Sequence, residues 1–115
     1  MFNFHNRRLF LYSQFTDMRK NFDSLAALVE NQIKLDPTSG DAFIFINKRK
    51  NRLKILIWED SGYWLLSKRL EVGTFSFQEN PEHPSFLLSN VQFQMLLDGI
   101  VLLKSKQLKR YKKIS

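Results

Sequence analysis

The sequence predicts an α+β fold: a single domain in which two helices pack on an antiparallel β-meander of about four to five strands. Two segments have apolar residues at helical spacing, and several short segments are rich in aromatic and β-branched residues. Turn residues separate these segments. The 115 residues suffice for one hydrophobic core. We therefore expect one α+β domain over 1–103, followed by a basic C-terminal tail over 104–115, whose folded or disordered state the sequence leaves open.

The first expected elements are a strand and a helix. Residues 7–13 place apolar side chains on both sides of an extended chain, which predicts a strand. The following apolar residues have the spacing of one helix face: Met18, Phe22, Leu25, Ala26, Val29 and Ile33. Thr16 is the expected N-cap of this helix. Pro37 and Gly40 follow its last apolar residue and are expected to end it.

The middle of the chain predicts the meander. Its expected strands are residues 42–46, 53–58, 63–70 and 75–77. Polar residues 47–52 are the expected hairpin tip, and residues 59–62 and 71–74 are expected turns. Two prolines in segment 79–85 predict a loop.

The second helix has the clearest local signature. Ser89 and Gln92 have the spacing of a capping box, and Leu88 with Phe93 fits a hydrophobic staple. Gly99 is suited to the left-handed residue that follows many helices. We therefore expect a helix that begins after Ser89 and ends near Gly99.

The charge of the chain is unevenly distributed. It has 18 basic and 11 acidic residues, for a net charge of +7. Segments 47–54 and 104–115 hold eleven of the basic residues and no acidic residue. Such concentrated basic segments predict binding to a polyanion, and nucleic acid is the expected partner. The alternative is that these segments are a solvated loop and a tail whose charge maintains solubility.

The sequence offers no pattern typical of an active site. It has no cysteine, its four glycines are isolated, and neither His5 nor His83 has a second ligand at helical spacing. The acidic candidates for metal-dependent strand transfer are Asp17, Asp23, Glu59 and Asp60. Capping, a surface ion pair and turn formation explain each of them. We therefore expect no catalytic residue, no metal and no cofactor.

Two basic sites are candidates for anion binding. If residue 59 faces residue 63, Trp58 faces Trp64 and Lys54 faces Lys68 on one side of the sheet, where an anion between the lysines would offset their repulsion. A shift of one residue would separate these pairs, and the alternative is that both tryptophans belong to the core. The second site is the expected first helical turn, where Arg19 and Lys20 would join the amide donors. The alternative there is a surface ion pair between Arg19 and Asp23.

Four separated blocks of the chain resemble one known family. The blocks TDMRKNFDSLAALV, DPTSGDAFIF, RLKILIWEDSGYWLLSKRLEVGTF and QFQMLLDGI occur in this order between about residues 8 and 101. They are similar to the small TnpB-type accessory transposition protein of insertion-sequence family sixty-six. The resemblance implies a role in DNA transposition beside a separate, larger transposase that carries the catalytic site. The segment 47–52 is less arginine-rich than the family pattern.

Residues and resemblance together predict a non-catalytic accessory protein of transposition that binds DNA, the transposase or both. The expected DNA-binding residues are Arg19, Lys20, Lys48, Arg49, Lys50, Arg52, Lys54, Trp58, Lys68 and Arg69. A protein-interaction adaptor without DNA contact is the alternative, and a nuclease that uses Asp17, Asp23 and Glu59 is a third hypothesis. We expect a cytoplasmic protein, because the sequence has no signal peptide and no apolar run of about 20 residues. The sequence does not specify the preferred DNA or the oligomeric state.

Overall fold

The domain is built on a five-stranded sheet with strand order β4-β3-β2-β1-β5. The computed structural model describes residues 3–100, so the predicted tail at 104–115 lies outside the described residues. The elements are β1 (Leu9–Tyr12), α1 (Phe22–Leu28), the π-helical turn η1 (Val29–Ile33), β2 (Ala42–Ile46), β3 (Arg52–Glu59), β4 (Gly62–Arg69), β5 (Ser85–Leu88) and α2 (Asn90–Asp98). These elements confirm the α+β class. Among the described residues, no helix has the length and apolar character needed to cross a membrane.

The strand pairing is mixed. β2, β3 and β4 form the predicted antiparallel meander, and the predicted bounds of β2 are confirmed. β1 instead runs parallel to β2, with Leu9 opposite Ala42, so the expectation of a purely antiparallel sheet was wrong. The reason is the helical crossover formed by α1 and η1, which returns the chain to the end of the sheet where β1 began.

The last strand also differs from the prediction. Residues 75–77 form no strand. Phe75 and Phe77 are buried in the core on one side of the sheet. The fifth strand is β5, which begins at Ser85, the last residue of the predicted loop 79–85, directly after Pro84. It pairs antiparallel with β1. Its edge position explains why a neighbouring proline is tolerated, since only one side of an edge strand needs its backbone donors.

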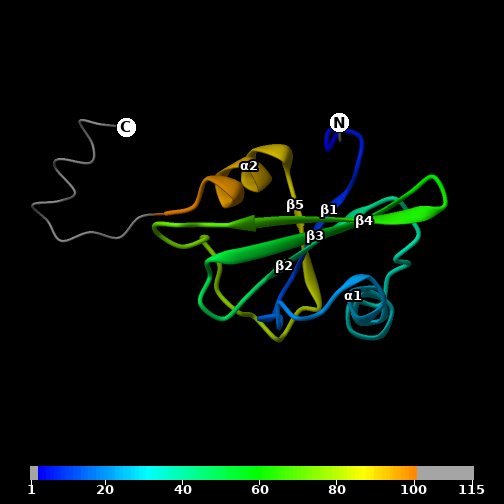
Figure 1. The fold of residues 1–115 in the computed structure, drawn as a ribbon, viewed down its shortest axis with the longest axis horizontal. Coiled ribbons are helices and arrows are strands. Elements are labelled where there is room, and N and C mark those ends of the chain that lie inside the picture. The colour runs from blue at the N-terminus through cyan, green and yellow to red at the C-terminus, as the bar shows by residue number, and fades with distance from the viewer. Residues whose placement is uncertain (1–2, 101–115) are drawn as a thin grey trace, which may run out of the picture.

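The two helices cover opposite faces of the sheet, as Figure 1 shows. On one face, Leu25 and Val29 pack with Phe43, Phe45 and other residues of the sheet. On the other face, the cluster joins residues of α2 to the sheet and to the segment after β4: it includes Phe93, Leu96, Ile44, Ile55, Phe75 and Phe77. Every residue of β2 is buried, because β2 lies between both layers.

The first helix begins later than predicted. Its N-cap is Asn21, whose backbone N–H donates to Ser24 Oγ at 2.9 Å, so Thr16 as N-cap was wrong. The N–H of Thr16 instead donates to the carbonyl of Ile46 at 2.8 Å, which holds this segment beside β2. The N–H of Lys20 donates to the Asp17 carbonyl at 3.1 Å. Arg19 and Lys20 therefore lie in a turn before the helix, and their predicted place in its first turn was wrong.

The second helix begins as predicted. Ser89 Oγ accepts from the N–H of Gln92 at 3.1 Å, and Gln92 Oε1 accepts from the N–H of Ser89 at 2.8 Å. Gly99 has a φ of 74° but a ψ of 177°, which only glycine adopts readily and which differs from the predicted left-handed helical conformation. A Cβ atom at this position would approach Leu70 Cδ1 to 2.8 Å.

The capping box of α2 yields a stability prediction. Substitution Ser89→Ala removes the acceptor for the Gln92 amide and should lower the free energy of unfolding by about 1 kcal/mol. The matched variant Ser89→Asp keeps an acceptor and should stay close to the original protein. Urea unfolding followed by circular dichroism measures both. Equal losses in the two variants would contradict a role for the cap.

Candidate nucleic-acid interface

The register of β3 and β4 differs by one residue from the predicted register. Trp58 lies opposite Tyr63, and Lys54 lies opposite Ser67. Asp60 and Ser61 have φ angles of 50° and 73°, as expected for the two central residues of a tight hairpin turn. This two-residue turn places Glu59 opposite Gly62. The predicted pairs Trp58–Trp64 and Lys54–Lys68 were therefore wrong, because the members of each pair point to opposite faces of the sheet.

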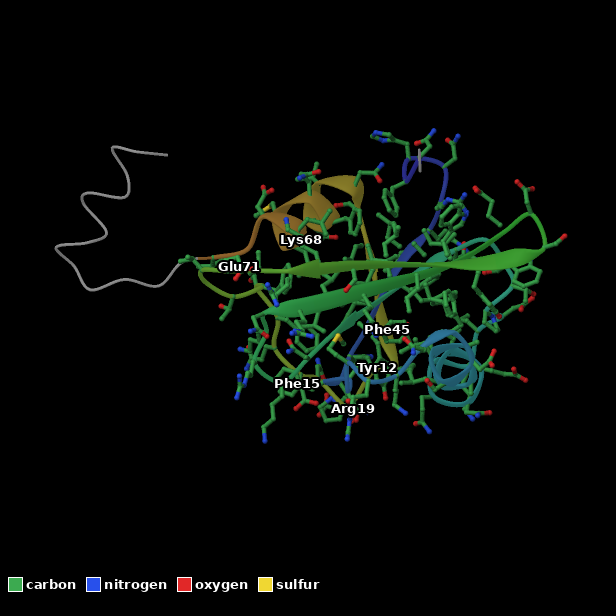
Figure 2. The ribbon with its side chains drawn as sticks, viewed as in Figure 1. Tyr12, Phe15, Arg19, Phe45, Lys68 and Glu71 are labelled. Carbon is green, nitrogen blue, oxygen red and sulfur yellow. The ribbon has the colours of Figure 1, made fainter. Side chains whose placement is uncertain are left out.

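Lys68 lies on the α2 side of the sheet. Its Nζ donates to the carbonyl of Leu97 at 2.7 Å, near the C-terminal end of α2. A cation at this end of a helix satisfies an unpaired carbonyl and interacts favourably with the helix dipole. Figure 2 shows Lys68 on the side of the sheet that carries α2 and Arg19 on the side that carries α1. The two residues therefore do not contribute to one common surface.

Trp58 lies at the acidic end of the α1 side. Its ring meets the ring of Tyr63 edge-on, with centroids 4.9 Å apart. Burial raises the pKa of the Tyr63 hydroxyl, and the nearby carboxylates of Asp36, Asp23 and Glu30 raise it further. A groove of about 740 Å³ beside Tyr63 is lined by these same three acidic residues and by one cation, Lys34. The net negative charge of this groove, beside the ring that Trp58 contacts, opposes phosphate binding there.

Lys54 connects β3 to the turn before α1. Its Nζ donates to the carbonyls of Met18 and Lys20, at 2.7 Å each. This half-buried ammonium group therefore fixes the 18–20 segment against the sheet. Its position gives Lys54 a structural role, and it also places Lys20 beside the β2–β3 hairpin.

Two further predicted residues have acidic partners. Arg19 pairs with Asp17, with Nη2 and Oδ2 2.7 Å apart, and not with Asp23 as the alternative prediction had it. The pKa of Asp17 falls from 3.8 to about 2, chiefly because the Arg19 side chain and backbone N–H donate to its carboxylate. Arg69 pairs with Glu71 at 2.8 Å. Both partners lie two residues from their arginine, a spacing that carries no recognised pairing signal in an irregular segment.

The remaining five predicted cations form what we call the tip surface: Lys20, Lys48, Arg49, Lys50 and Arg52. Within residues 3–100 none of the five has an ion pair with an acidic side chain. Lys48, Arg49 and Arg52 are exposed, and the other two are half-buried. A groove of about 410 Å³ separates Lys48 and Arg49 from residues 15–18. The hairpin tip and the turn before α1 therefore share one side of the molecule.

The backbone under the tip surface is fixed by hydrogen bonds. Asn47 Oδ1 accepts from the N–H groups of Asn51 and Arg52 at 3.0 and 2.9 Å. The carbonyl of Lys50 accepts from the N–H of Phe75 at 2.7 Å. Arg52 lies opposite Arg69 across the hairpin, and the ion pair of Arg69 with Glu71 reduces their repulsion. The cations thus project from an ordered loop.

Comparison with known proteins identifies the family. Residues 7–107 match the family described as IS66 Orf2 like protein. The chain belongs to this IS66 Orf2-like family. Two relatives come from Sinorhizobium fredii. The uncharacterized protein y4jC is 34% identical over 110 residues, which cover 94% of this chain and 93% of y4jC. The uncharacterized protein y4hO is 38% identical over 96 residues, which cover 83% of this chain and 82% of y4hO.

Membership in the IS66 Orf2-like family confirms the resemblance seen in the sequence blocks and supports an accessory role in transposition of IS66 elements. No solved structure matches this IS66 Orf2-like chain. The geometry of the tip surface is therefore the direct basis for a proposal about its contacts.

The contacts of Lys54 predict a structural role that can be measured. Substitution Lys54→Met keeps the aliphatic stem but removes both bonds to the 18–20 segment, and it should lower the free energy of unfolding by about 1–3 kcal/mol. The control Lys48→Met changes an exposed cation of the tip surface and should alter stability by less than about 0.5 kcal/mol. Urea unfolding measures both variants, and equal stability of the two would refute the structural role.

The Asp17–Arg19 pair predicts a pH dependence of stability. Because folding lowers the pKa of Asp17, the pair stabilises the protein fully above the unfolded pKa of 3.8 and loses this effect as the pH falls through about 2. Substitution Asp17→Asn should therefore reduce the loss of stability between about pH 4 and pH 2. Urea unfolding across this range measures the effect. Parallel curves for both proteins would contradict the assignment.

Proposed function

We propose that this IS66 Orf2-like protein is a non-catalytic accessory protein that binds DNA through its tip surface during transposition. The observation that carries the proposal is a cluster of five cations without acidic partners. Arg7, Arg8, Arg19 and Arg69 pair with carboxylates, whereas the five cations of the tip surface have no such pair among residues 3–100. Cations whose charge is not neutralised by the protein can neutralise phosphates and release counterions.

The distribution of charge along β3 also supports contact of DNA with the tip surface. Arg52 at the start of β3 belongs to the tip surface, and Trp58 near its end lies beside the acidic groove. Six residues of strand correspond to roughly 20 Å. A polyanion is thus attracted to one end of the domain and repelled from the other.

The acidic residues support the non-catalytic part of the proposal. The nuclease hypothesis would use the carboxylates of Asp17, Asp23 and Glu59. Two of them have arginine partners: Asp17 pairs with Arg19, and Glu59 pairs with Arg7. Carboxylates neutralised by arginine are poorly suited to hold divalent cations. We therefore assign strand transfer to the separate transposase, the second proposed partner, and place both proteins in the cytoplasm with the DNA.

A protein-interaction adaptor is the second candidate function. A groove of about 450 Å³ on the α2 side supports it, because Leu88, Met95, Leu96 and Ile100 give its lining apolar character. Met95 is 65% exposed, so α2 presents apolar surface to solvent. Lys48 and Arg49 do not line this groove, so variants at these two positions can separate the two functions.

Removal of two cations tests DNA binding. The double variant Lys48→Gln, Arg49→Gln should weaken binding to duplex DNA and lower the slope of log K against log salt by about 1.8, since each lost phosphate contact accounts for about 0.9. The matched control Lys34→Gln, Lys68→Gln removes the same charge outside the tip surface and should change the slope little. Fluorescence anisotropy at several salt concentrations measures the slopes.

Three outcomes distinguish the candidates. A larger effect in the tip variant supports the proposal, and equal effects in both variants would show that net charge alone matters. Absence of DNA binding by the original protein, together with retention of the transposase in a pull-down by both variants, would replace DNA binding with the adaptor function. Circular dichroism of each variant confirms that it is folded.

A further inference from the structure

The aromatic rings near the tip surface are engaged in the core. Phe75, whose N–H binds the carbonyl of Lys50, is 1% exposed. Phe15 lines the groove beside Lys48, but its ring packs edge-on against Phe77 with centroids 5.5 Å apart. Proteins that bind single-stranded nucleic acid stack successive bases on exposed rings beside a basic groove. The tip surface offers no such row of rings among the described residues.

Two aromatic side chains are strongly exposed within the described part of the chain, and neither forms a stacking platform with the tip. Trp64 lies opposite Ile57 and therefore on the α2 side, five residues of β4 or roughly 17 Å from Arg69. Phe22 lies two residues after Lys20 and is 44% exposed. This single ring offers one stacking position at most, and substitution tests it directly.

The side-chain amides of the tip are used within the loop. Asn47 Oδ1 accepts two backbone N–H groups, and Asn47 Nδ2 donates to Asn51 Oδ1 at 2.8 Å. Free asparagine and glutamine amides read adenine in the major groove by pairing donor and acceptor together. Because Asn47 Oδ1 and Nδ2 are both engaged, the tip presents chiefly lysine and arginine cations, and the contacts of such cations with phosphates carry no sequence information.

A surface that acts by charge alone favours the polyanion with the higher charge density. Duplex DNA carries about one charge per 1.7 Å of its axis, against about one per 3.4 Å for each strand. The fixed backbone under the tip also matches a stiff duplex, since neither partner loses much conformational freedom on contact.

We propose that the tip surface binds double-stranded DNA in preference to single strands, through phosphates and without sequence preference. This inference rests on the proposed DNA-binding function and specifies its substrate. Lys48, Arg49, Lys50 and Arg52 contact the duplex backbone, and Lys20 extends the contact from the turn before α1. Phe22 and Trp64 take no part.

Anisotropy with labelled oligonucleotides tests this inference on the full chain. We would compare a duplex of about 20 base pairs, its separate strands and a duplex of scrambled sequence between about 50 and 200 mM salt. The original duplex should bind about tenfold more tightly than either strand, and the scrambled duplex should bind within about twofold of it. Substitutions Phe22→Ala and Trp64→Ala should each change affinity by less than about twofold, because loss of a stacked base costs about fivefold or more.

The results that would overturn this inference differ from the result that would overturn DNA binding as such. Equal or tighter binding of single strands, or a fivefold loss in Phe22→Ala, would overturn the duplex preference and leave DNA binding intact. A difference of more than about fivefold between the two duplexes would overturn the lack of sequence preference, since one misread base pair has about that effect. No binding to any oligonucleotide would overturn the proposed function.

Discussion

The structure depends on the complete burial of β2. All five of its side chains are inaccessible, so the strand requires an apolar layer on each face. One layer is supplied by α1 and η1, and the other by α2 with Phe75 and Phe77. The pairing of β1 with β2 is parallel, and a parallel pair needs a crossover connection. The crossover here contains α1 and η1, so the same segment connects the two strands and covers one face of β2.

Burial on both faces also determines where charge can be placed. The two layers exclude cations from β2, and most basic residues occur at strand ends, in turns and on the edge strand β4, with half-buried Lys54 in β3 as an exception. Lys68 then satisfies a carbonyl at the end of α2, and Lys54 binds two carbonyls of the turn before α1. Four of the cations without such a structural use lie at the β2–β3 tip: Lys48, Arg49, Lys50 and Arg52.

Much of the fold could be predicted from local patterns, and the rest depended on distant contacts. The bounds of β2 and the Ser89–Gln92 box follow from residues within a few positions of one another. The edge strand β5 depends on its pairing with β1 and is obscured by Pro84. The register of β3 and β4 required the two-residue turn at Asp60 and Ser61, a pair less typical of this turn than Asn-Gly. For the site, the absence of acids in 47–54 predicted the tip surface, whereas the carboxylates that neutralise Arg19 and Arg69 have no sequence signal.

The pairing of β1 with β5 has a consequence for biosynthesis. Leu9 lies opposite Leu88, so the contacts at this edge of the sheet join the first strand to the last. Contacts between residues so distant in sequence form slowly, because a long loop must close first. On the ribosome, the meander of β2, β3 and β4 can form while β1 still has one unpaired edge. The sheet is completed only after β5, which ends at Leu88, has emerged.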